Sequence, residues 1–223
     1  MTSEQQVEAA LKSYEDVDSW KTIIFLYNAA LKEVGTKLEI LNDEFQHVHQ
    51  YNPIEHIKTR IKTPESIVKK LRRYGHETSI ENMVRYVNDI AGIRISCSFT
   101  SDIYLIADMI SKQNDLTILA RRDYMKNPKK SGYRSYHMLV TTPAFLSDSI
   151  IDTKVEIQIR TVAQDFWATL EHKMHYKFEG DGPDYITKEL RECARYVAEL
   201  DTRMEELNNE IQKYGKLSDK KSP

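Results

Sequence analysis

Cysteine is scarce in this 223-residue sequence, which contains only Cys97 and Cys193. The two residues stand far apart, and neither belongs to a pair with the spacing of metal ligands. A structural zinc site or a disulfide framework is therefore not expected. Cys97 alternates with Ile95 and Phe99 in an apolar pattern, which favours a buried thiol over a reactive one.

Glycine and proline are also rare, at 7 and 6 residues, and no segment rich in Pro, Gly or Ser divides the chain. The length suffices for one substantial hydrophobic core. We therefore expect a single domain with helical extensions over residues 18–214, between a frayed N-terminus (1–17) and a disordered tail (215–223).

Long apolar runs and an excess of charge of one sign are both missing. No run approaches the length of a membrane span, and the polar N-terminus lacks the basic start and apolar stretch of a secretion signal. We expect a cytoplasmic protein without membrane contact. The net charge of −2 argues against extensive binding to nucleic acid. Basic residues nevertheless cluster in 57–73 and 121–134, which suits a small polyanion better than a long one.

Several catalytic signatures are absent as well. The sequence has no GxSxG string, no GxxxxGK[ST] phosphate loop and no GxGxxG dinucleotide fingerprint. His172 and His175 stand a turn apart in the string EHKMH, but their order differs from the HExxH pattern of zinc proteases. These absences disfavour a serine hydrolase, a P-loop ATPase and a Rossmann enzyme.

The densest set of chemical groups lies in the string KKSGYRSYH and in the string VEIQIR that follows it. The first predicts a strand that begins near Gly132, and a two-residue repeat then points Tyr133, Ser135 and His137 to one side. The second alternates apolar residues with Glu156 and two other polar residues. A carboxylate in mid-strand is thereby held on the open face of a sheet.

Hydrophobic periodicity predicts the other elements. Thr63 is expected to cap a helix that starts at Pro64, and Gly75 to end that helix. The strand that contains His137 is expected to stop before Pro143. In order, we expect a helix over 18–50, a strand over 56–62, helices from Pro64 and from Ser79, a strand over 93–99, a helix from Ser101 or Asp102, a strand near 116–125, the strands around Tyr133 and Glu156, a helix from Thr161 whose stripe of Val162, Phe166, Leu170 and Met174 lies in the core, and one or two helices over 184–214.

Three strands, around Arg60, Arg94 and Glu156, place apolar residues on one face and charged residues on the other. This alternation predicts an α+β fold in which helices cover one side of an antiparallel or mixed sheet and the other side is an open polar cleft. Asp89 stands just before a strand, next to a turn that Gly92 permits. It is either a turn former or a metal ligand, and the sequence leaves both interpretations open.

The residues expected in this cleft suit a reaction at nucleotide phosphates. Asp89 and Glu156 offer hard oxygen ligands, and magnesium typically uses one or two carboxylates together with substrate phosphates. Tyr133 beside Gly132 can stack on a purine, a contact worth about 1–3 kcal/mol. A phosphoryl-type transfer then needs alignment, charge neutralisation and one base near the attacking hydroxyl. The cations expected at the cleft are Arg60, Lys62, Lys70, Arg73 and Arg94.

Four strings together resemble the synthetase domain of RelA/SpoT homologues, in the stand-alone form called small alarmone synthetases. They are RIKTPESIVKKLRR, DIAGIRISCSF, RRDYMKNPKKSGYRSYH and VEIQIRTVAQDFWATLEHKMHYK, and the resemblance extends over residues 18–210. It implies a nucleotidyltransferase-like fold and a magnesium-dependent transfer of pyrophosphate from ATP to the ribose 3′-hydroxyl of GDP or GTP. The products would be AMP and the alarmones ppGpp or pppGpp of the stringent response.

The resemblance also implies roles for individual residues. Asp89 and Glu156 would bind magnesium, and Glu156 would also be the base for the 3′-hydroxyl. On the ATP side, Arg60 and Arg94 would sandwich the adenine, and Lys62, Ser66, Lys70 and Arg73 would hold the phosphates. On the acceptor side, Tyr133 would stack on guanine, Lys129 and His137 would hold the phosphates, and Arg122, Gln158 and Glu171 match further cleft positions.

Within the small synthetases, NPIEHIKTR and DFWATLEH resemble the RelP branch more than the RelQ branch. His56 stands where RelQ proteins have an effector-site Phe, which argues against activation by the alarmone itself. Both branches form homotetramers, which implies an interface over residues 18–50 and 184–214. The sequence contains no His-Asp dipeptide and lacks the length of a second catalytic domain, so we expect synthesis without alarmone hydrolysis. The alternative is a catalytically silent relative that binds single-stranded RNA as a regulator.

Overall fold

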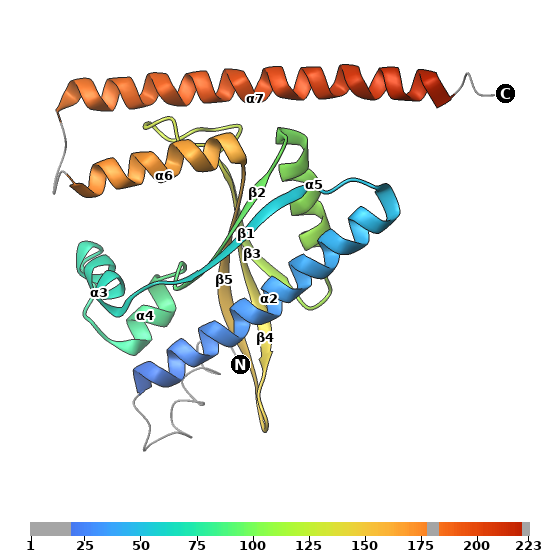
Figure 1. Cartoon of the computed structure of the whole chain (residues 1–223). Coiled ribbons are helices and arrows are strands. Elements are labelled where there is room, and N and C mark those ends of the chain that lie inside the picture. The colour runs from blue at the N-terminus through green and yellow to red at the C-terminus, as the bar shows by residue number, and fades with distance from the viewer. Residues whose placement is uncertain (1–18, 178–182, 220–223) are drawn as a thin grey trace.

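The computed structural model describes residues 19–177 and 183–219. Over these ranges the chain forms a five-stranded mixed β-sheet flanked by helices, which confirms the expected α+β class (Figure 1). The segment 1–17 and the last four residues, 220–223, lie outside the described part, so the expected disorder there is not addressed. Among the described helices, none combines the length and the apolar character needed to cross a membrane.

The sheet has the strand order β1-β2-β5-β4-β3. β2 and β5 run parallel to each other, and every other neighbouring pair is antiparallel. The bounds are β1 (Ile54–Ile61), β2 (Ala91–Cys97), β3 (Thr117–Asp123), β4 (Tyr136–Phe145) and β5 (Ile150–Thr161). The long β5 is therefore the central strand, and the string VEIQIR lies in the middle of the sheet.

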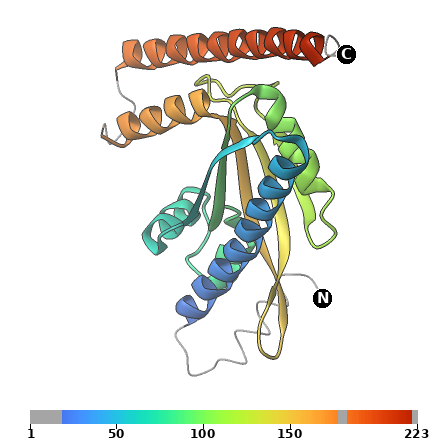
Figure 2. The ribbon, with the colours of Figure 1, turned by 45° about the vertical axis from the view of Figure 1, so that its right-hand side comes forward.

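The helices are α2 (Ser19–His49), α3 (Pro64–Arg73), α4 (Ile80–Tyr86), α5 (Thr100–Ser111), α6 (Val162–Lys177) and α7 (Asp184–Asp219). α2 crosses one face of the sheet, with α5 beside it (Figure 2). α3 and α4 pack against each other and contribute buried residues to the same hydrophobic core as α2. α6 and α7 run antiparallel to each other beyond one end of the sheet.

The hydrophobic core lies between α2 and the sheet face that it covers. Ile93 and Ile95 of β2, and Ile157 and Ile159 of β5, are at most 1% exposed. The predicted two-residue alternation is therefore confirmed on both strands, because the same residues that fill the core leave their polar neighbours on the opposite face.

The predicted boundaries of α3 and the predicted start of α4 are also confirmed. The Thr63 hydroxyl accepts a hydrogen bond from the backbone N–H of Ser66 at 3.3 Å, and Ser79 caps α4 in the same way, from Asn82 at 3.1 Å. Gly75 follows α3 with φ at 75°, a conformation that glycine adopts without the steric penalty of a Cβ atom.

Two strand predictions were wrong. β4 begins at Tyr136, so Tyr133 lies in the preceding loop, where Gly132 N–H donates to the carbonyl of Lys129 at 2.8 Å and closes a turn. β4 also continues through Pro143. β3 pairs with β4 only as far as Thr141, so Pro143 lies where one edge of β4 is open, and proline is tolerated at such an edge.

Two helix predictions after residue 99 were wrong, and of the one or two helices expected over 184–214 the structure has one. α5 begins at Thr100, after Phe99, whose N–H donates to the Asp102 carboxylate at 3.0 Å. The predicted core stripe of α6 is exposed, with Phe166 at 65%, because α7 packs instead on the side of α6 that carries Trp167, at 3%. Residues 184–219 form a single helix that extends beyond 214 into the expected tail.

Candidate active site

A row of polar side chains crosses the sheet face that α2 leaves open. Paired positions on neighbouring strands share a face, so the strand register itself brings these residues together. One row, read from β1 to β3, contains Lys58, Arg94, Gln158, His137 and Arg122. The adjacent row contains Arg60, Gly92, Glu156 and Leu139. The predicted cations and the predicted carboxylate therefore occupy one continuous surface.

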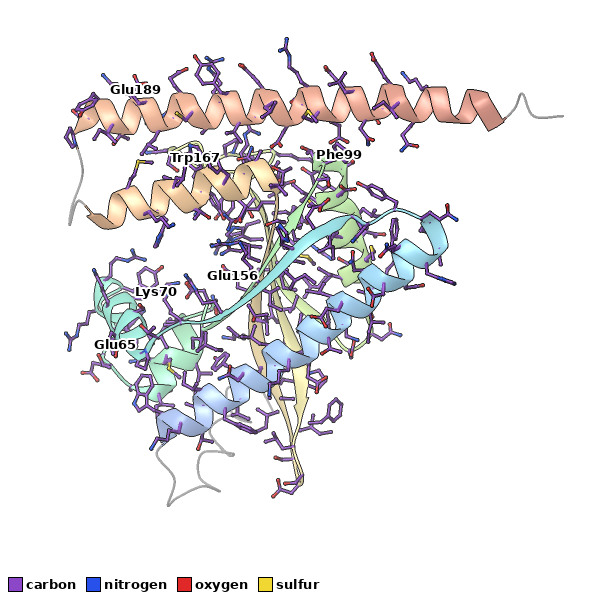
Figure 3. All side chains as sticks on the ribbon, in the orientation of Figure 1. Glu65, Lys70, Phe99, Glu156, Trp167 and Glu189 are labelled. Atoms are coloured by element: carbon purple, nitrogen blue, oxygen red, sulfur yellow. The ribbon has the colours of Figure 1, made fainter. Side chains whose placement is uncertain are left out.

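A cleft of about 280 Å³ opens on this surface. Glu156 stands near the middle of the sheet and Lys70 on the neighbouring α3 (Figure 3). The lining residues are Lys58, Thr59, Arg60, Asp89, Gly92, Ile93, Arg94, Glu156 and Gln158. Five of them, from four different segments of the chain, are predicted site residues, so the structure brings together the two carboxylates and the two arginines that the sequence placed in one cleft.

Asp89 is held between two lysines. Its Oδ1 accepts a hydrogen bond from Lys70 Nζ at 2.8 Å, and its Oδ2 accepts one from Lys62 Nζ at 2.9 Å. Burial alone would raise the pKa of Asp89, but the two ammonium groups outweigh it and hold the pKa below its usual value. Asp89 is therefore an anion at neutral pH that collects two cations at the edge of the cleft.

Glu156 is fixed by its neighbours in the two rows. Its Oε2 accepts a hydrogen bond from Gln158 Nε2 at 2.8 Å, and its Oε1 lies 3.6 Å from His137 Nδ1. Burial tends to raise the pKa of Glu156, but the His137 and Gln158 side chains lower it further than burial raises it. The carboxylate is therefore ionised and oriented before any ligand enters.

Tyr133 reaches the same surface from its loop. Its hydroxyl lies 2.9 Å from His137 Nε2, so the predicted neighbours are in contact although Tyr133 is not in a strand. The Lys129 ammonium lies 4.7 Å from the centre of the Tyr133 ring, and the Arg160 guanidinium lies 5.4 Å from it. Burial raises the pKa of Tyr133, so the phenol stays neutral. The result is an aromatic plate surrounded by cations.

Sequence reasoning missed the role of Asp165 on α6. Its Oδ1 lies 3.3 Å from Arg94 Nη1 and 3.6 Å from Nη1 of Arg160, which is 2% exposed. Burial lowers the pKa of Arg160, whose guanidinium also donates to Gln158. Asp165 thus links Arg94, which lines the cleft, to Arg160, which lies against the Tyr133 ring. No local pattern signals this, because its partners come from β2 and β5.

The other predicted residues lie around the cleft rather than in its lining. Ser66 is in the first turn of α3, and Arg73 is exposed at the end of α3 over the Tyr74 ring. Arg122 is exposed on β3 at the far end of the first row. Glu171 lies further along α6 than Asp165. For these residues the structure supplies a position on the elements that surround the cleft.

The donor set of the cleft fits magnesium. Asp89 and Glu156 line one cleft, and magnesium commonly combines one or two carboxylates with phosphates and water.

Comparisons with known proteins show which proteins this chain is similar to. The family described as "Region found in RelA / SpoT proteins" matches residues 59–181. The GTP pyrophosphokinase YwaC of Bacillus subtilis is 43% identical over 195 residues, which cover 87% of this chain and 93% of that protein. The crystal structure of small alarmone synthetase 2 of Bacillus subtilis has a TM-score of 0.79 at 42% identity and covers 86% of this chain and 100% of that chain.

This chain is also similar to a second solved relative, whose structure is known with two different ligands. Small alarmone synthetase 1 of Bacillus subtilis, bound to its product pppGpp, has a TM-score of 0.81 at 35% identity and covers 86% of this chain and 98% of that chain. The same protein bound to AMPCPP has a TM-score of 0.76 at 32% identity, with coverage of 87% and 98%. Each of these relatives covers more than four fifths of this chain.

Proposed function

The chain belongs to the RelA/SpoT family, and we propose that it is a small alarmone synthetase that transfers pyrophosphate from ATP to the 3′-hydroxyl of GDP or GTP. One observation carries the proposal. The cation-lined cleft and the aromatic plate lie on the same sheet face, and Glu156 stands between them. Its carboxylate lies beside one ring nitrogen of His137, and the Tyr133 hydroxyl contacts the other. The relatives named GTP pyrophosphokinase, and the solved ones bound to pppGpp and AMPCPP, support two nucleotide subsites.

ATP occupies the β1–β2 side in this proposal. Arg60 and Arg94 stand on neighbouring strands at the cleft, and their planar guanidinium groups can stack on both faces of adenine. The phosphates then lie toward Lys62 and Lys70, and they replace the Asp89 oxygens as partners of the two ammonium groups. Ser66 and Arg73 extend this phosphate site along α3.

The guanine nucleotide occupies the β4–β3 side. Its base stacks on Tyr133, and its phosphates lie among Lys129, His137 and Arg122. Gln158 holds the Glu156 carboxylate in place through the hydrogen bond described above. Glu171 is assigned to this acceptor side by its motif alone.

The reaction is an in-line displacement at the β-phosphorus of ATP. The acceptor 3′-oxygen forms a bond to that phosphorus, the bond from phosphorus to the bridging α–β oxygen breaks, and AMP leaves with the electron pair. Glu156, ionised because of its lowered pKa, accepts the proton of the 3′-hydroxyl. Magnesium, held by Asp89 and Glu156 when it is bound, supplies charge neutralisation at the phosphate oxygens.

The family context extends the proposal to assembly and location. Exposed apolar side chains follow one another along α7 and α6, which favours burial against further copies of this chain in a homotetramer. These residues are Tyr196, Leu200, Met204, Leu207 and Ile211 of α7, and Val162, Phe166 and Leu170 of α6. Both substrates are cytoplasmic nucleotides, so we place the reaction in the cytoplasm. We assign synthesis only, because the sequence has no His-Asp dipeptide.

A label-transfer assay tests the proposed function. The protein is incubated with magnesium, GDP and ATP that carries a radioactive terminal phosphate, and a parallel reaction contains 3′-deoxy-GDP. We expect labelled guanosine tetraphosphate and an equal amount of AMP with GDP, and no labelled guanosine nucleotide with the 3′-deoxy acceptor. Absence of product, together with tight and salt-sensitive binding of single-stranded RNA, would favour the silent RNA-binding alternative.

A further inference from the structure

The loop that carries Tyr133 rests directly on helix α7. Gly132 has a φ of +93°, and a Cβ atom built on it would lie 2.5 Å from the Cβ atom of Ala194. That separation is far below van der Waals contact, so the loop backbone and the helix meet as closely as a glycine and an alanine permit. A larger side chain on either side would push the two segments apart.

Helix α7 cannot easily yield at this point, because it is held on both sides of Ala194. Toward its N-terminus, Trp167 Nε1 of α6 donates to the carbonyl of Leu190 at 2.9 Å, and Trp167 lies between α6 and α7 (Figure 3). Toward its C-terminus, Thr161 Oγ1 and Gln164 Nε2 donate to the Asp201 carboxylate at 2.9 and 3.0 Å. The position of Ala194 is therefore fixed relative to the end of β5 and the start of α6.

The loop transmits this position to the groups that face the acceptor. Two backbone hydrogen bonds tie its residues together, from Gly132 N–H to the Lys129 carbonyl at 2.8 Å and from Lys129 N–H to the Tyr133 carbonyl at 3.1 Å. Tyr133 also packs against a small cluster formed by Trp167, Ala168 and Ala194, separate from the main core. A shift of Gly132 would move the aromatic ring and the neighbouring ammonium group together.

We propose that Ala194 is a positioning residue for the acceptor nucleotide, which acts by setting the height of the Gly132–Tyr133 loop above α7. Its small size determines how the Tyr133 ring meets the guanine base, while the ATP side of the cleft depends on β1, β2 and α3. Ala194 touches neither substrate. The inference rests on the proposed function, since it assigns the loop to the guanine nucleotide.

The first test compares two leucine substitutions on α7. Ala194→Leu adds its side chain against Gly132, whereas Glu189→Leu adds the same side chain at an exposed position of the helix. Binding of GDP and of AMPCPP is measured separately by calorimetry. Loss of one base–aromatic stack predicts about 5- to 150-fold weaker GDP binding for Ala194→Leu, unchanged AMPCPP binding, and no change of either affinity for Glu189→Leu.

A rescue experiment separates the contact from general loss of stability. Gly132→Ala introduces both the clash with Ala194 and the unfavourable φ, so it should also weaken GDP binding. Ala194→Gly removes the Cβ atom that the new alanine would meet, so the double variant Gly132→Ala/Ala194→Gly should bind GDP more tightly than Gly132→Ala alone. The recovery is limited because residue 132 still has a positive φ, which alanine disfavours.

The outcomes distinguish this inference from the function on which it rests. Equal GDP affinity in the native protein and in Ala194→Leu, or a double variant no better than Gly132→Ala, would overturn the inference and leave the proposed function intact. Absence of GDP binding by the native protein would overturn both. Selective loss of GDP affinity with recovery in the double variant would support the role of Ala194.

Discussion

Replacing Asp89 with asparagine should destabilise the empty protein and change its response to ATP. The substitution keeps the shape of the side chain but removes the charge that faces two ammonium groups. Lys62, Asp89 and Lys70 have side chains that are 15%, 20% and 19% exposed. The variant would therefore confine two like charges in a mostly buried site without a counter-ion.

The expected magnitude follows from that burial. Removing one partner of a buried ion pair typically costs about 3–5 kcal/mol. The lysines can swing partly into the open cleft, so we expect the free energy of unfolding to fall by about 2 kcal/mol for Asp89→Asn, or about 4–8 °C in Tm for a chain of this size. Asp115→Asn is the matched control, because Asp115 also pairs with a lysine, Lys37, at 2.8 Å but is 49% exposed. An exposed pair contributes only about 0–1 kcal/mol.

Thermal unfolding with and without AMPCPP in the presence of EDTA provides the assay. The phosphates supply the missing negative charge, so AMPCPP should raise Tm more in Asp89→Asn than in the native protein. An unchanged Tm in Asp89→Asn, together with an AMPCPP response equal to the native one, would refute the reasoning.

The pairing of Asp89 with Lys62 and Lys70 also predicts how the stability of the fold depends on pH. The pKa of Asp89 is lowered in the fold, so its stabilisation is present above the unfolded-state pKa of about 3.9 and is lost as pH falls through the folded value; Asp89→Asn should lose less stability on acidification.

Three further outcomes are expected. Glu156→Gln should lower kcat by about 10²–10⁴-fold while GDP and AMPCPP still bind in calorimetry, because the amide keeps the shape but cannot accept the proton; near-native turnover would exclude Glu156 as the base. Asp165→Asn should raise KM for both substrates by about tenfold, since the residue holds Arg94 and Arg160 together; a rise for only one substrate in steady-state assays would contradict that link. Leu207→Glu, at a position 53% exposed in the single chain, should lower the mass measured by light scattering, and an unchanged mass would exclude this part of α7 from the interface.

Much of the site could be predicted because strand periodicity is a local property. Ile93 and Ile157 alternate with Arg94 and Glu156 in the sequence itself, so burial of the first pair leaves the second on the open face. The helix after Thr63 was equally local, since the cap and the first proline lie within a few residues of each other.

The errors came from contacts between distant segments. The α6 stripe was expected in the core because helical periodicity shows which residues share a face, but not which face meets α7; the structure buries Trp167 and leaves Phe166 exposed. Pro143 was expected to end β4, but the shortness of β3 leaves an open edge there. Asp165 on α6 has no nearby signal, since its partner Arg94 lies on β2. In each case a neighbouring element decides which face is buried, where the strand ends or which ion pair forms. The sequence of the element itself carries no information about that neighbour.

We propose above that ATP and the guanine nucleotide occupy opposite sides of one sheet face and meet at Glu156. A crystal structure of the protein with magnesium, AMPCPP and GDP tests it most directly. We predict adenine between Arg60 and Arg94, guanine on Tyr133, and the acceptor 3′-hydroxyl within hydrogen-bond distance of Glu156. Adenine on the Tyr133 ring, or a 3′-hydroxyl directed away from Glu156, would contradict the account.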